Sequence, residues 1–88
     1  MYIESINNLT LNTSVGDYKI IELKVRGKKA KLEKFNSDIQ DFFDMADEEW
    51  TDSLSMLTMT FDNKPKEQTM NMIKSFTKNY IEQLTINS

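Results

Sequence analysis

The sequence predicts a small α+β domain, in which an antiparallel sheet carries two helices packed on one face, in the order β-β-β-α-β-α. Three observations support this prediction. Apolar and polar residues alternate over much of residues 9–26, which is the period of a half-buried strand. Two later stretches repeat apolar residues every three or four positions, as amphipathic helices do. The chain has 88 residues, so we expect a single domain, 1–88.

The first two strands are predicted to form a β-hairpin. Residues 9–15 alternate apolar with polar side chains, and residues 18–26 do the same. Gly16-Asp17 lies between them and is typical of a short turn.

Residues 28–35 fit either a strand or the first half of a helix. A helix that began near residue 28 would place three lysines in its first turn, where the helix macrodipole is positive. A helix that began at Ser37 would have a capping box and an acidic first turn instead. We therefore expect a third strand at 29–35 and a helix at 37–50. One long helix, 29–50, with the order β-β-α-β-α, is the alternative.

The last strand and the last helix follow. Residues 53–61 are apolar on both faces, which predicts a strand at the centre of the sheet. At an edge of the sheet, such a strand would favour a homodimer. Residues 62–65 break the pattern and offer a helix cap followed by a proline. From Lys66 to about Leu84 the apolar period is helical.

Charge is strongly segregated along the chain. Residues 18–35 contain seven Lys and Arg against two Glu, a net +5, whereas residues 36–62 contain eight Asp and Glu and no cation, a net −8. The net charge of −3 therefore hides two opposed blocks.

The acidic block would lie on the polar side of the helix predicted at 37–50. Its carboxylates would then stand about 5–6 Å apart along the helix axis, an interval similar to that between phosphates on a nucleic-acid strand. Such a row could mimic nucleic acid and cover a basic groove on an enzyme. The simpler interpretation is the ordinary solvated face of an amphipathic helix. The candidate partner-binding residues are Asp38, Asp41, Asp44, Asp47, Glu48, Glu49 and Asp52.

The composition argues against catalysis. The chain contains no Cys and no His, so it lacks a thiolate nucleophile, the commonest general base and the commonest ligands of zinc. It also lacks the glycine loops that bind phosphates and the loop pattern of a calcium site. We therefore expect no enzymatic activity, no cofactor and no metal site.

The leading hypothesis is a non-enzymatic protein-binding module, concretely an inhibitor whose acidic helix covers a basic site on a nucleic-acid enzyme. The small size, the absence of Cys and His and the acidic run resemble in composition the inhibitor proteins that phages and other mobile elements encode, although no residue motif matches one. A nucleic-acid-binding accessory protein is the alternative, and a self-assembling structural or adaptor subunit is another. The basic patch of that first alternative comprises Lys24, Arg26, Lys28, Lys29 and Lys31.

The sequence also predicts where the protein works. Residues 1–4 lack the basic start and the apolar run of a signal peptide. No stretch approaches eighteen consecutive apolar residues, so we expect no membrane span. A cytoplasmic protein is the resulting expectation.

Overall fold

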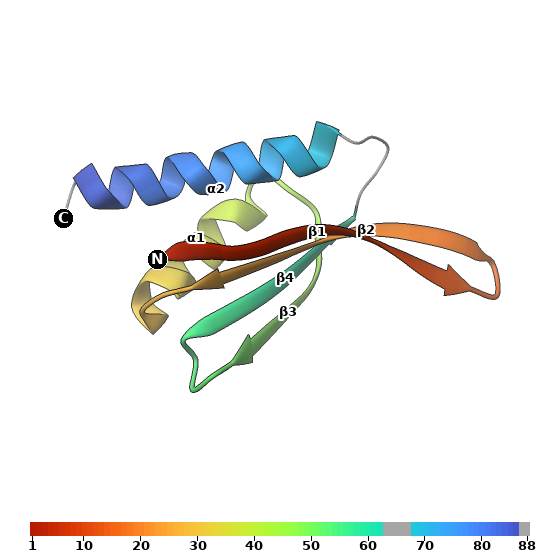
Figure 1. The fold of residues 1–88 in the computed structure, drawn as a ribbon, viewed down its shortest axis with the longest axis horizontal. Helices are drawn as coiled ribbons and strands as arrows, with labels where there is room; N and C mark the ends of the chain where they lie inside the picture. Colours follow the sequence, from red (N-terminus) through yellow and green to blue (C-terminus); the bar gives the residue numbers. More distant parts are fainter. Residues whose placement is uncertain (63–67, 87–88) are drawn as a thin grey trace.

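The computed structural model describes residues 1–62 and 68–86 of the chain. Six elements follow one another: β1 (Tyr2–Thr13), β2 (Gly16–Arg26), α1 (Lys29–Gln40), β3 (Met45–Thr51), β4 (Met56–Asp62) and α2 (Gln68–Ile86) (Figure 1). The strands form one antiparallel sheet in the order β1-β2-β4-β3. The predicted α+β class, with an antiparallel sheet and two helices, is confirmed. The order of the elements is β-β-α-β-β-α, which differs from both predicted orders.

The hydrophobic core lies on one face of the sheet. Alternate residues of the two central strands point into it, and both helices cover it, as the sequence predicts. Its fully buried members are Ile21, Leu23 and Val25 of β2, Leu57, Met59 and Phe61 of β4, Leu32, Phe35 and Ile39 of α1, and Ile73 of α2. Each such side chain contributes about 1.5–3 kcal/mol when it leaves water, so this cluster is the main source of stability.

The first hairpin is longer than predicted, and its turn lies two residues earlier. Thr13 pairs with Gly16, which leaves Ser14 and Val15 as the turn. The Thr13 hydroxyl donates to the carbonyl of Gly16 (2.6 Å) and accepts from the amide of Val15 (3.3 Å). Gly16 has a φ of 124°, which a residue with a side chain rarely adopts. The glycine therefore closes the hairpin as the first residue of β2.

The strand predicted at 29–35 is wrong, because these residues begin α1. Leu32 and Phe35 are an odd number of residues apart, so a strand would send them to opposite faces. On a helix they lie on one face together with Ile39, and all three are fully buried. Burial of three such side chains outweighs the unfavourable lysines in the first turn, which cost about 0.3–1 kcal/mol each.

The helix predicted at 37–50 is also wrong, because α1 ends at Gln40 and β3 follows. A helix through residues 41–49 would stack carboxylates three and four residues apart, and each like-charge pair of that kind is destabilising. As a strand, the same segment packs Met45 and Trp50 against the core. The register shifts between Met45 and Asp47, and this bulge turns the two apolar residues to the same face despite their odd spacing.

The remaining two elements agree with the sequence pattern. β4 is a central strand, between β2 and β3, as predicted. It occupies Met56–Asp62 and so begins three residues later than the predicted strand 53–61, because Asp52, Ser53 and Leu54 have positive φ and form the β3–β4 turn. A homodimer formed by adding a strand to β4 is therefore impossible in this sheet. α2 runs over residues 68–86, in the predicted region. Its predicted start, at Pro65 and Lys66, lies outside the described residues.

The hairpin of β1 and β2 extends beyond the rest of the sheet (Figure 1). β4 pairs with β2 only from Ile20 to Arg26, so the distal part of the hairpin is a two-stranded ribbon. This arm gives the molecule its longest dimension, 46 Å against 28 and 20 Å. Val15 at its tip is 95% exposed.

Candidate protein-interaction surface

The structure distributes the predicted acidic residues over four different segments. The prediction that they share one face of a helix at 37–50 is therefore wrong. Asp38 is on α1, Asp41 caps its end, Asp44 lies in the loop that follows, Asp47, Glu48 and Glu49 belong to β3, and Asp52 lies in the β3–β4 turn.

β3 is an edge strand and directs its carboxylates to both faces of the sheet. Asp47 and Glu49 stand opposite Thr60 and Thr58, on the face away from the helices. Two residues apart on one strand, they are about 7 Å from each other. Glu48 points to the helical face, where it accepts a hydrogen bond from the side-chain amide of Asn36.

Three of the predicted acidic residues have side-chain partners elsewhere in the domain, and the Asp47 carboxylate accepts a hydrogen bond from the adjacent Glu48 amide at 2.9 Å. Asp38 accepts a hydrogen bond from the Tyr80 hydroxyl at 2.9 Å. Asp52 forms an ion pair with Arg26 at 2.7 Å, and Glu48 is held by the asparagine of α1. These three carboxylates are therefore engaged in contacts within the domain and are less available to a partner.

The other four form what we call the acidic edge: Asp41, Asp44, Asp47 and Glu49. All four are exposed. Within the described residues, none of them forms an ion pair with a lysine or arginine. The acidic edge follows the loop after α1 and then the open edge of the sheet, so its negative charge faces solvent.

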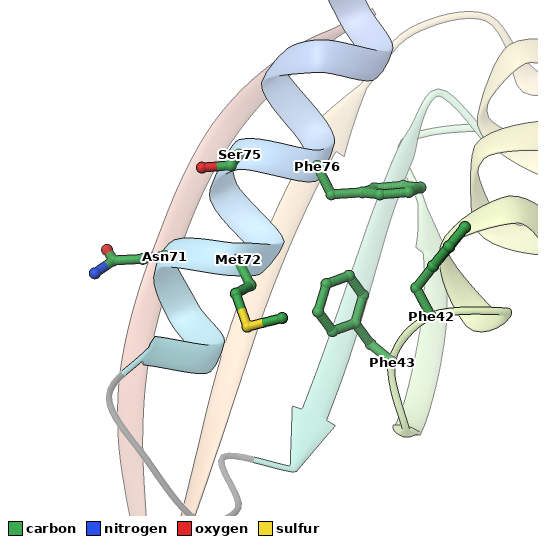
Figure 2. Close-up of a pocket in the computed structure, with 6 residues that line it drawn as sticks. All are labelled: Phe42, Phe43, Asn71, Met72, Ser75 and Phe76. Atoms are coloured by element: carbon green, nitrogen blue, oxygen red, sulfur yellow. The ribbon is translucent and has the colours of Figure 1, made fainter.

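An apolar groove lies beside the start of the acidic edge, between the loop after α1 and the first half of α2. Figure 2 shows Phe42 and Phe43 of the loop facing Met72 and Phe76 of α2, whereas Asn71 and Ser75 at its margin point away from the rings. The groove has a volume of about 560 Å³. It continues past the phenylalanines into a smaller hollow of about 180 Å³, which Asp44, Asp62 and Thr69 line with Phe42, Phe43 and Met72.

Two of the four apolar side chains that line this groove are largely exposed to water. Phe42 is 69% exposed and Met72 is 58% exposed. This groove was not predicted from the sequence, because the helix predicted at 37–50 would include Phe42 and Phe43 in its apolar stripe. Adjacent residues of a helix point about 100° apart, which the apolar stripe of an amphipathic helix accommodates, so this pair of aromatic residues gave no signal that either would be exposed.

The predicted basic patch is divided between two elements. Lys24 and Arg26 are on β2, whereas Lys28, Lys29 and Lys31 are at the start of α1 and not on a strand. Three of these five cations have carboxylate partners. Lys24 lies 3.9 Å from Glu22, Arg26 lies 2.9 Å from Glu4 and 2.7 Å from Asp52, and Lys29 lies 3.6 Å from Glu33. Among the described residues, the ion pair between Arg26 and Asp52 is the only one that joins the basic block to the acidic block.

Comparison with known proteins gives no match. No protein-family model, curated protein or solved structure matches this chain.

Two tyrosines near this surface have raised pKa values. The Tyr18 hydroxyl donates to Asp62, which lines the smaller hollow, and this hydrogen bond raises the pKa of Tyr18. Burial raises the pKa of Tyr80 to about 12, helped by its hydrogen bond to Asp38. Both tyrosines therefore stay protonated at neutral pH, where each serves as a hydrogen-bond donor to a carboxylate.

The described residues contain no group of three or more side chains arranged to hold a metal ion. No helix in the described part of the chain is long and apolar enough to cross a membrane. What the surface offers is a row of exposed carboxylates next to an open aromatic groove, and both features suit recognition of another macromolecule.

Proposed function

We propose that this protein is a non-enzymatic protein-binding module whose acidic edge binds a basic surface on another protein. The observation that carries the proposal is the exposure of Asp41, Asp44, Asp47 and Glu49 without ion-pair partners among the described residues. Unpaired charges at a surface attract an oppositely charged partner and accelerate its association. In concrete form, the protein is an inhibitor that covers the basic, nucleic-acid-binding surface of an enzyme.

The edge position of β3 supports this proposal in two ways. An edge strand presents unpaired backbone groups, to which a partner can add hydrogen bonds. Consecutive charges at Asp47, Glu48 and Glu49 discourage pairing with another copy of the same strand, because like charges would face each other. A basic segment meets no such repulsion.

Nucleic-acid binding through the lysines is less well supported. Lys24, Arg26 and Lys29 are each within 4 Å of a carboxylate, so their charge is partly neutralised. The net charge of −3 would also repel a polyanion.

A charge-neutralised variant tests the proposal. Asp41→Asn, Asp44→Asn, Asp47→Asn and Glu49→Gln together remove four negative charges from the acidic edge. The matched control removes four carboxylates elsewhere, with Asp17→Asn, Glu22→Gln, Glu33→Gln and Glu82→Gln, and reaches the same net charge. Both variants and the parent protein are used as bait in lysates of the producing cells, and captured proteins are then purified and titrated against each bait.

We expect the parent and the control to bind the same basic protein, with an affinity that falls as salt rises. The charge-neutralised variant should bind at least about tenfold more weakly. Equal binding by both variants would refute the proposal, because the position of the carboxylates would then be irrelevant.

A further inference from the structure

The apolar groove adds a second element of recognition to the acidic edge. Three of its lining residues are aromatic, and two of them, Phe43 and Phe76, pack against the hydrophobic core. Phe76 contacts Phe42 at a ring-centroid distance of 5.2 Å and Phe43 at 6.0 Å. Behind the groove, Phe76 also contacts Phe35 of the core at 6.2 Å, and Phe43 contacts Phe61 of β4 at 6.2 Å. The groove is therefore preformed, which lowers the entropic cost of binding.

The fourth apolar residue of the groove, Met72, has a flexible side chain. Met72 is an unbranched, polarisable side chain that can repack around different apolar groups. It lies opposite the phenylalanines (Figure 2) and is largely exposed. An aromatic pocket with one methionine wall fits a bulky apolar anchor, and a volume of about 560 Å³ accommodates one or two such side chains.

The charges around the groove are negative. Asp44 and Asp62 line the hollow that continues it, and Asp41 directly precedes Phe42. The margin on α2 is uncharged, because Asn71 and Ser75 occupy it. Lys74 is adjacent to Ser75 in the sequence but is not among the residues that line the groove. Among the described residues, the lining of the groove and of the hollow that continues it contains carboxylates and no lysine or arginine.

The described residues of a second copy offer no free segment that combines both requirements. The exposed bulky side chains elsewhere are Leu9, Leu11, Val15 and Tyr18 of the hairpin arm, Leu54 of the β3–β4 turn, and Tyr2. Only Tyr18 has a lysine or arginine within three positions, Lys19, and the Tyr18 hydroxyl already donates to Asp62. The complementary ligand is therefore a different molecule.

We propose that the groove and the carboxylates beside it bind a Lys/Arg-rich segment of the partner protein that carries a bulky apolar anchor. The anchor fills the space between Phe42, Phe43, Met72 and Phe76, and the flanking cations meet Asp41 and Asp44. This inference rests on the proposed function, since it names the part of the partner that the acidic surface recognises.

The test uses labelled synthetic peptides and fluorescence anisotropy. The first peptide has lysines and arginines flanking one tryptophan, the second has alanine in place of the tryptophan, and the third keeps the tryptophan but replaces the cations with glutamates. Phe42→Ala and Met72→Ala alter the groove, whereas Leu11→Ala alters a comparably exposed apolar residue on the distant arm. Because these side chains are exposed, the variants should fold, and the peptide series alters no residue of the protein at all.

We expect the first peptide to bind the parent protein and the Leu11→Ala variant equally. Loss of the tryptophan, or of Phe42 or Met72, should weaken binding about tenfold, as truncation of a buried anchor does. The glutamate peptide should not bind. Asp41→Asn with Asp44→Asn should weaken binding of the first peptide and reduce its dependence on salt.

Other outcomes distinguish the two proposals. Binding that depends on the cations but not on the tryptophan, Phe42 or Met72 would overturn the groove inference and leave the proposed function standing. No measurable binding of the first peptide would overturn the inference directly. Self-association in sedimentation that Phe42→Ala abolishes would also overturn it, because the groove would then be occupied by a second copy.

Discussion

The beginning of α1 provides a sharp test of the forces that position this helix. Lys28 is its N-cap residue, with an extended backbone (φ −71°, ψ 142°), and its carbonyl accepts the hydrogen bond from the amide of Leu32 at 3.0 Å. The Lys28 side chain makes no capping hydrogen bond, and no acidic residue occupies the first turn. The helix therefore begins with unsatisfied amides and with cations at the positive end of its dipole.

Two substitutions at Lys28 separate these two defects. Lys28→Ala removes the cation and should raise the free energy of unfolding by about 0.3–1 kcal/mol, the usual effect of one charge at a helix end. Lys28→Ser removes the same charge and also offers a hydroxyl to the amides of the first turn, which should add about 0.5–2 kcal/mol. For a domain of this size, each kcal/mol corresponds to about 4–8 °C in Tm.

Urea unfolding followed by circular dichroism and by the fluorescence of Trp50 measures both variants. We expect the order of stability Lys28→Ser above Lys28→Ala above the parent, with unchanged dependence on urea concentration. If Lys28→Ser is no more stable than Lys28→Ala, residue 28 does not cap a helix. Residues 29–35 would then be better described as the strand that their charges favour.

Four further predictions follow from buried, titrating, paired and strained groups. Phe35→Ala should cost about 3–5 kcal/mol and abolish the cooperative urea transition of so small a domain, and a loss under about 1 kcal/mol would contradict its central place in the core. Because folding raises the pKa of Tyr80 from 10.0 to about 12, its contribution to stability should be complete below pH 10 and lost as the pH rises to about 12. Tyr80→Phe should lack this step in a titration of phenolate absorbance, and its stability should fall less steeply over that range. Arg26→Gln should lower the free energy of unfolding slightly at low salt, because it removes the ion pairs with Glu4 and Asp52, and the difference from the parent should shrink in concentrated salt. Ser53 has a φ of 57° in the β3–β4 turn, so Ser53→Gly should stabilise the domain by about 1 kcal/mol in the same urea assay, whereas destabilisation would contradict a left-handed backbone there.

The fold class could be predicted because its strongest signals are periodic over long stretches. The hairpin alternates over many residues, and α2 repeats its apolar positions over several turns, so local pattern and tertiary packing agree. The prediction for residues 28–35 was wrong because the burial of Leu32 and Phe35 on one helix face outweighs the unfavourable interaction of the lysines with the helix macrodipole. Leu32 and Phe35 are three positions apart, a spacing that a regular strand would send to opposite faces and a helix to the same face, and this spacing was visible in the sequence.

β3 was harder to predict, because a β-bulge interrupts the alternation of apolar and polar residues along this strand. Met45 and Trp50 are five positions apart, and a regular strand would send them to opposite faces. The shift in register between Met45 and Asp47 corrects this, but only pairing with β4 determines where the extra residue is placed. Sequence alone therefore gave no periodic signal for a strand in a run that also contains three consecutive acidic residues.

The misplaced helix and the missed groove have a common physical origin, which is the end of α1 at Gln40. Had the helix continued to residue 50, its backbone would have carried the carboxylates to a solvated face. Because the helix ends, the amides of Phe42 and Phe43 bond back to the carbonyl of Ile39 at 3.1 and 3.2 Å, and the chain leaves the helix axis. Phe43 then packs towards β4 while Phe42 remains exposed beside α2, and the acidic residues continue along an open edge of the sheet. A substitution that loosened this helix end should therefore disturb the groove and the acidic edge together, whereas replacement of Asp47 or Glu49 in β3 should affect the acidic edge alone.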